Sequence, residues 1–166
     1  MQNAVFSLLV DNTSGVLTRI SGMFSRRGYN IDSLTVGVTA NPRYSRMTVV
    51  VNGDEAIIDQ IEKQIRKQED VVEVKVLKDG KSVCRELIMV KIRASAQDRQ
   101  SVIAITDIFR AKIVDVGEDS MVMELTGNQA KLDAFVNLLS DYEILELART
   151  GITGLSRGSD DVTYLD

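Results

Sequence analysis

Histidine is absent from the 166 residues of this chain, and cysteine occurs only once. Histidine is the most common general base and metal ligand in proteins, because its ring titrates near neutral pH. Its absence excludes Ser-His-Asp and Cys-His catalysis and, with a single cysteine, nearly all zinc sites. Carboxylate, lysine or tyrosine chemistry remains possible, so the composition lowers the expectation of an enzyme without removing it.

Three other features that the sequence lacks bear on its location and partners: a second cysteine, a long apolar segment and an excess of basic residues. Cys84 cannot form an internal disulfide, which suits a reducing compartment. No basic segment followed by a long apolar stretch opens the chain, and no apolar run approaches the ~20 residues of a membrane helix. The formal net charge of −4 offers no basic surplus for a nucleic acid. We therefore expect a cytoplasmic protein that binds neither membranes nor nucleic acids.

The first half of the sequence alternates strand and helix patterns in the order β-α-β-β-α-β. Strands are expected where β-branched and apolar residues cluster or alternate, at Ala4–Val10, Asn30–Thr39, Met47–Val51 and Val72–Val76. Helices are expected where apolar residues follow one-sided helical spacing, at Val16, Leu17, Ile20, Met23 and Phe24 and at Ile57, Ile58, Ile61 and Ile65.

The second half repeats this order. Its expected strands are Leu87–Ile92, Ile113–Val116, Met121–Leu125 and Ile144–Ala148, with helices marked by Val102, Ile105 and Phe109 and by Leu132, Phe135, Val136 and Leu139. We predict an α+β chain of two tandem ferredoxin-like βαββαβ units, with domains at 1–79 and 80–166 and a loose tail from Gly151. Because such sheets leave one face bare, a homodimer is expected.

The turn before the first helix is the sharpest candidate binding feature. A helix N-terminus presents unpaired N–H groups and partial positive charge, so it can receive a carboxylate. Gly15 lets a ligand approach the backbone, and Asn12 offers both a donor and an acceptor to a zwitterionic amino acid. For an isolated turn the more common explanation is that Thr13 or Ser14 caps the helix.

A second candidate follows the same helix. Asn30 and Ile31 lie far from the Asn12 turn within one chain, but across a dimer they could face the Asn12 turn of the other copy. An amide and an apolar wall would then surround a small branched side chain. The simpler explanation is that Gly28 ends the helix and Asn30 begins a strand.

Longer strings resemble the ACT domain and the rest of the acetolactate synthase (acetohydroxyacid synthase) small subunits. In the first half these strings are Leu8–Leu17, Phe24–Val36, Ser45–Thr48 and Gln60–Ile65. In the second half they are Arg85–Ile92, Lys131–Phe135, Ala148–Gly151 and Leu155–Gly158. The resemblance covers essentially the whole chain, and the string RGYNIDSLTV is specific.

The resemblance implies a regulatory subunit without activity of its own. It would bind a large catalytic subunit that joins two pyruvates to acetolactate and CO2, raise its activity and confer feedback inhibition by valine. Thiamine diphosphate, Mg and FAD would belong to that catalytic subunit, and none would bind this chain. The effector would lie between two ACT domains, contacting Asn12, Gly15, Val16 and Leu17 of one chain with Asn30 and Ile31 of its neighbour. The choice among valine, leucine and isoleucine stays open.

Four other classes compete with this interpretation. An acylphosphatase-like enzyme needs an arginine and an asparagine poised in one loop, which Arg19 and Asn12 do not form. An RNA-binding module needs aromatic residues on its middle strands, and a copper chaperone needs a CxxC pair. An ACT-type amino-acid sensor for a different biosynthetic enzyme remains the alternative.

Overall fold

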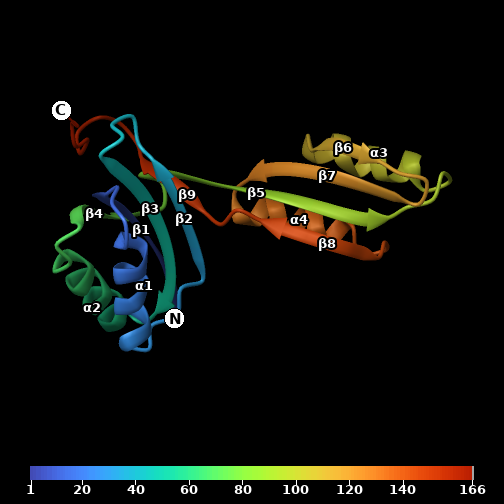
Figure 1. Cartoon of the computed structure of the whole chain (residues 1–166). Helices are drawn as coiled ribbons and strands as arrows, with labels where there is room; N and C mark the ends of the chain where they lie inside the picture. Colours follow the sequence, from blue (N-terminus) through green and yellow to red (C-terminus); the bar gives the residue numbers. More distant parts are fainter. Residues whose placement is uncertain (166) are drawn as a thin grey trace. The chain divides into compact units, whose positions relative to one another are not determined.

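The computed structural model describes residues 1–165, which form two compact units. The first unit comprises Met1–Cys84 together with the C-terminal residues from Ile152, and the second comprises Arg85–Gly151. The first unit contains a four-stranded antiparallel sheet and two helices, and the second contains two helices and most of a five-stranded sheet (Figure 1). The prediction of two βαββαβ units is confirmed.

The first unit follows the expected element order. Its elements are β1 (Gln2–Asp11), α1 (Val16–Arg26), β2 (Ser33–Val38), β3 (Tyr44–Gly53), α2 (Glu55–Arg66) and β4 (Val71–Leu77). The strands lie in the order β2-β3-β1-β4, and all pairs are antiparallel. This order leaves β2 and β4 as edge strands.

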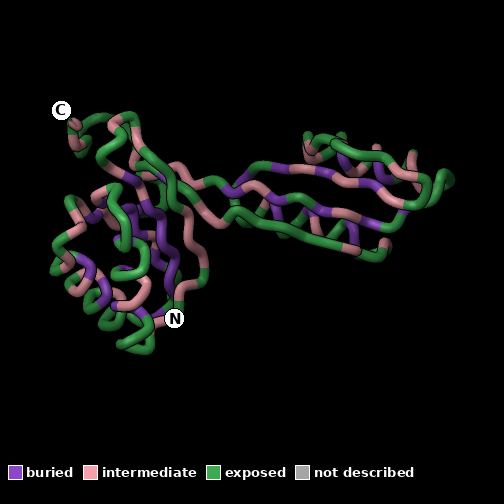
Figure 2. The backbone as a smooth tube through the Cα atoms, viewed as in Figure 1, coloured by how far each residue is buried: buried purple, intermediate pink, exposed green. Residues whose placement is uncertain are grey.

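Alternation along the strands decides which face of this sheet meets the helices. Since successive side chains of a strand point to opposite faces, every second residue of β1 and β3 faces α1 and α2. The buried core on that side contains Phe6, Leu8, Val10, Ile20, Met23, Phe24, Met47, Val49, Val51, Ile61 and Ile65. Figure 2 shows the same concentration of buried residues along the strands.

The second unit repeats the arrangement. Its elements are β5 (Ser82–Arg93, which begins in the first unit), α3 (Arg99–Phe109), β6 (Lys112–Val116), β7 (Ser120–Gly127), α4 (Gln129–Leu138) and β8 (Ile144–Arg149). The strand order is β6-β7-β5-β8. Its core contains Ile88, Val90, Ile92, Val102, Met121, Met123, Leu125, Leu132, Phe135 and Leu139. Each half of the chain therefore builds its own core.

The C-terminal segment differs from the expected loose tail of a second domain. A short strand, β9 (Thr153–Ser156), pairs with β5, and the backbone N–H of Arg157 donates to the carbonyl of Lys81. The segment from Ile152 belongs to the first unit, which itself extends to Cys84 rather than ending at residue 79. The physical reason is that this segment finds hydrogen-bond partners on β2, β4 and β5, which its composition alone does not reveal.

Candidate functional site

The turn between β1 and α1 is held by the hairpin turn between β2 and β3. The backbone N–H of Asn12 donates to the carbonyl of Arg43 over 2.8 Å, and its side-chain Nδ2 donates to the carbonyl of Pro42 over 2.8 Å. The side-chain NH2 of Asn12 therefore has an internal partner, and its carboxamide oxygen is the group left to accept from a ligand. Asn12 itself is exposed.

The first turn of α1 begins without a side-chain cap. Gly15 occupies the cap position with φ +87°, in the left-handed region that glycine adopts without steric cost. Its carbonyl accepts the first regular helical bond, from the N–H of Arg19 over 2.9 Å. The alternative that Thr13 or Ser14 caps this helix is wrong, because neither side chain bonds to the first turn. The helix thus presents backbone donors and partial positive charge at an exposed glycine.

Arg19 adds a full positive charge to this turn, and the sequence analysis did not single it out for this role. Its Nε donates to Oδ2 of Asp70 over 2.6 Å and its Nη2 donates to Oδ1 over 3.1 Å, which leaves Nη1 on the side of Gly15. A Cβ placed on Gly15 would lie 2.7 Å from that Nη1. The hydrogen bond to Asp70 raises the pKa of Arg19, and the same bond from Arg19 lowers the pKa of Asp70.

One signal for Arg19 does exist in the sequence. It lies four residues after Gly15, and helical side chains lean toward the N-terminus, over the preceding turn. Asp70 lies 51 residues further along and has no such signal.

The two apolar site residues of the first turn have different surroundings. Val16 is buried in the core of the unit at 4% exposure, so its side chain faces the sheet and it can offer a ligand only its backbone. Leu17 is 46% exposed. Of the two, only Leu17 can supply an apolar wall at the surface.

Asn30 and Ile31 lie beyond the other end of the same helix. The side-chain Nδ2 of Asn30 donates to Oδ1 of Asp32 over 2.6 Å, and Ile31 packs partly against the core. Because α1 has 11 residues, its ends are about 16 Å apart at ~1.5 Å per residue. One chain therefore does not bring Asn30 and Ile31 to the Asn12 turn.

The strand that follows these residues has an open edge. Thr39 donates its N–H to the carbonyl of Tyr44, and in antiparallel ladders the bonded pairs recur every second residue. The backbone groups of Leu34, Val36 and Val38 are therefore the ones directed away from β3. Val36 and Val38 are also exposed, Val38 to 62%. Their side chains share the helix-covered face, since their partners on β3 are Met47 and Ser45.

Residues 1–165 contain neither a metal-binding cluster nor a membrane-spanning helix. No group of three or more histidine, cysteine, aspartate or glutamate side chains is arranged to hold a metal ion in that part of the chain. In the same residues, every helix is too short or too polar to cross a membrane.

Comparison with known families first identifies the class of the N-terminal unit. Residues 6–73 match the model of the AHAS small subunit-like ACT domain. Residues 85–158 match the family described as the small subunit of acetolactate synthase. The chain belongs to the family of acetolactate synthase small subunits.

Individual relatives agree over nearly the whole length. The probable acetolactate synthase small subunit of Methanothermobacter thermautotrophicus is 47% identical over 156 residues, which is 93% of each chain. The acetolactate synthase isozyme 3 small subunit of Escherichia coli is 48% identical over 155 residues, covering 93% of this chain and 95% of that one. The crystal structure of the acetolactate synthase small subunit from Thermotoga maritima superposes with a TM-score of 0.88 at 38% identity, covering 96% and 99%. The chain is thus similar to these subunits across both of its units.

Proposed function

We propose that this regulatory subunit binds a catalytic acetolactate synthase subunit, raises its activity and makes it sensitive to valine. The observation that carries the effector part of the proposal is the uncapped first turn of α1, with Gly15 at positive φ beside the guanidinium of Arg19. Backbone donors, a helix dipole and a full positive charge converge there, which is a suitable setting for the α-carboxylate of an amino acid.

The remaining groups of an amino acid find partners around this turn. The carboxamide oxygen of Asn12 can accept from an ammonium group, since its nitrogen is already bonded to Pro42. Leu17 provides an apolar wall for a branched side chain. A methylene in such a pocket is worth only ~1–3 kcal/mol, so an apolar wall alone gives modest discrimination among branched-chain amino acids.

A homodimer formed along β2 completes this pocket. If β2 pairs with β2 of a second copy and the pairing is centred on Val36, Asn30 of one copy falls opposite Pro42 of the other. Pro42 accepts the amide of Asn12, so Asn30 and Ile31 arrive beside the Asn12 turn of the second copy. The ligand then contacts both copies, and its binding favours one arrangement of the dimer over others.

Reconstitution with the catalytic subunit tests the proposal. The purified chain is mixed with an acetolactate synthase catalytic subunit, and acetolactate formation is assayed with and without valine. We expect the chain to raise the activity and valine to lower it again. Unchanged activity on addition of the chain would contradict the catalytic partnership and favour a sensor for a different enzyme. Activation without any valine response would contradict the effector site alone.

A further inference from the structure

The C-terminal segment crosses the sheet face of the first unit that the helices leave uncovered. It begins at β2, where the N–H of Ile152 donates to Oγ of Ser33 and the hydroxyl of Thr35 donates to the carbonyl of Ile152. It ends at β4, where the hydroxyl of Thr163 donates to Oε1 of Glu73. Leu9 and Val50 lie on this face, outside the helix-side core, and both are buried. The first unit therefore covers its second face with its own chain.

The first half of this segment is fixed by close packing. Gly154 is buried, and a Cβ placed on it would lie 2.8 Å from Cδ1 of Leu77 and 2.7 Å from Sγ of Cys84. The backbone of β9 also pairs with β5. Only a residue without a side chain allows the backbone to approach so closely. Release of β9 would disrupt both this packing and its pairing with β5.

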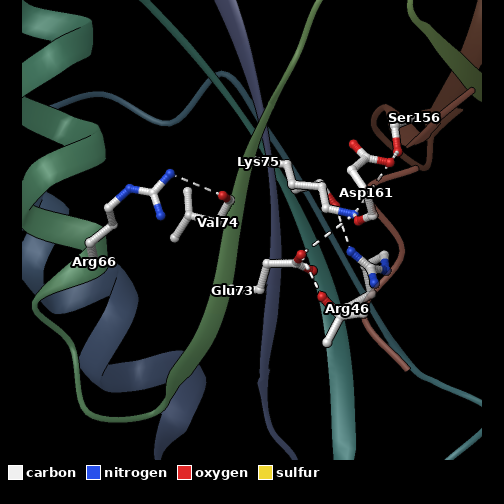
Figure 3. A network of polar contacts seen from close by, with 9 residues as sticks. Arg46, Arg66, Glu73, Val74, Lys75, Ser156 and Asp161 are labelled. Carbon is white, nitrogen blue, oxygen red and sulfur yellow. Dashed lines mark hydrogen bonds and ion pairs between the residues drawn. The ribbon is translucent and has the colours of Figure 1, made fainter. Parts of the chain in front are cut away.

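The second half is held mainly by polar contacts. Lys75 donates to the backbone carbonyl of Asp161, and its Nζ lies 3.9 Å from Oδ1 of Asp161 and 3.5 Å from Oε1 of Glu73 (Figure 3). Apolar burial contributes little to this half, since Val162 is exposed, Tyr164 is 80% exposed and only Leu165 is half-buried. Polar contacts exchange for contacts with water when they break, so they hold a segment less firmly than apolar burial does.

The polar contacts beneath this second half are also incomplete. Within the described residues, Oε2 of Glu73 is buried without a hydrogen-bond partner. A buried carboxylate oxygen without a partner disfavours the packed position of the C-terminal segment, because this oxygen binds water again when the segment moves away.

A glycine separates the two halves. Gly158 has φ +76°, and a Cβ placed on it would meet nothing within 4 Å. The chain at this point is exposed and unpacked, yet the closed conformation requires the left-handed region. Such a position can absorb a change in backbone direction without disturbing its neighbours.

We propose that residues 159–165 form a latch, hinged at Gly158, that opens from Glu73 and Lys75 while β9 stays in place. Opening breaks the contacts of Lys75 and Glu73 with Asp161 and Thr163, together with the bond from Ser156 to Asp161 over 2.9 Å. The latch regulates the access of solvent and solutes to Glu73 and Lys75, the polar part of the second sheet face. This device is independent of the effector site and of the proposed dimer edge.

Two side chains report on the two halves separately. The ammonium group of Lys75 lies under the latch with 18% of its side chain exposed, and the thiol of Cys84 lies against Gly154 under β9. Brief treatment of the full chain with acetic anhydride measures access to Lys75, and iodoacetamide measures access to Cys84, both read by mass spectrometry. Lys63, whose side chain is 67% exposed, serves as the internal reference for reagent dose.

Gly158→Val is the deciding variant, because a branched residue disfavours the closed φ. The left-handed region costs a non-glycine residue enough to raise the open-to-closed ratio by about fivefold to thirtyfold. We expect acetylation of Lys75 to rise in that range while Cys84 keeps its original rate. Ser159→Val is the matched control, with the same new side chain one residue away, and it should leave Lys75 unchanged. A chain ending at Gly158 gives the rate for a fully open latch.

Three outcomes would overturn the proposal. Lys75 could react at the original rate in Gly158→Val although the shortened chain reacts faster, which would mean that Gly158 is no hinge. Lys75 and Cys84 could become reactive together, which would mean that the segment leaves as one piece. Lys75 could also react at one rate in all chains, which would mean that residues 159–165 do not cover it.

Discussion

Arg19 holds its guanidinium over Gly15, with Nη1 placed 2.7 Å from the position that a Cβ on Gly15 would take. The two residues are one helical turn apart, and the carboxylate of Asp70 fixes the guanidinium from the other side over 2.6 Å. Any side chain at position 15 therefore meets a fixed cation. This relationship determines what substitutions at the turn do.

Gly15→Asp should abolish valine binding, measured by isothermal titration calorimetry. The new carboxylate would lie beside Arg19 and would pair with the guanidinium that we assign to the effector's carboxylate. The positive φ of Gly15 adds strain, since aspartate adopts that region only at a cost. Gly80→Asp is the matched control, because Gly80 also has positive φ but has open space around it. Undiminished valine binding by Gly15→Asp would contradict the proposed site.

Asn30→His should weaken valine inhibition of the reconstituted holoenzyme. The substitution replaces an amide that donates to Asp32 with a larger ring and alters a wall of the pocket proposed for the dimer. Loss of one good polar contact predicts an inhibition constant about tenfold higher or more. Asn137→His, on the exposed surface of α4, is the control, and a holoenzyme that carries it should keep its normal inhibition by valine. An unchanged valine response in Asn30→His would count against a pocket shared between copies.

Val38→Asp should convert the proposed dimer to a monomer in sedimentation velocity experiments. In a pairing centred on Val36, a charge at this exposed position would lie opposite Leu34 of the other copy, where lost apolar contact and an unpaired charge oppose pairing. Val116→Asp makes the same change on β6, the edge strand of the other sheet, and serves as the control. A stable Val38→Asp dimer would place the contact between copies elsewhere.

The carboxyl group of Asp70 should titrate below its ordinary pKa of 3.8 in an NMR pH titration, because Arg19 donates to its charged form. Since the folded-state pKa lies below the unfolded-state value, this group favours folding above pH 3.8. That contribution is lost as the pH falls through the folded-state pKa. The effect on stability should be small, because Arg19 is exposed to solvent.

Arg19→Met tests the cause of that shift. Removing the guanidinium should return the pKa of Asp70 toward 3.8. Lys63→Met removes a cation from an exposed pair on α2 and should leave Asp70 unchanged. If the pKa of Asp70 were the same with and without Arg19, the guanidinium would not be its source.

Local patterns accounted for much of the architecture and for part of the site. Apolar alternation in β1 and helical spacing in α1 located these elements, because each residue's burial follows from the geometry of its own element. The exposed glycine turn was also predictable. The contact between Arg19 and Asp70 was not, since it joins residues 51 positions apart through tertiary structure.

The C-terminal segment shows the other limit of local patterns. Its glycine, serine and aspartate residues have the composition of a loop, and that composition predicted a loose tail. Gly154 instead permits close packing against Leu77, and Asp161 reaches Lys75 across 86 positions of sequence. Composition describes what a segment can do alone, whereas these contacts depend on a sheet that forms elsewhere in the chain.

The return of the C-terminus has a practical consequence for dissecting this protein. A fragment cut after residue 79 would lose the C-terminal segment that crosses the sheet face on which Leu9 and Val50 lie, and more of that face would meet water in every isolated molecule. A self-sufficient excised unit needs residues 152–165 grafted behind Cys84 by a designed connector. Fragments whose ends are chosen from the sequence repeat alone would divide the first folded unit.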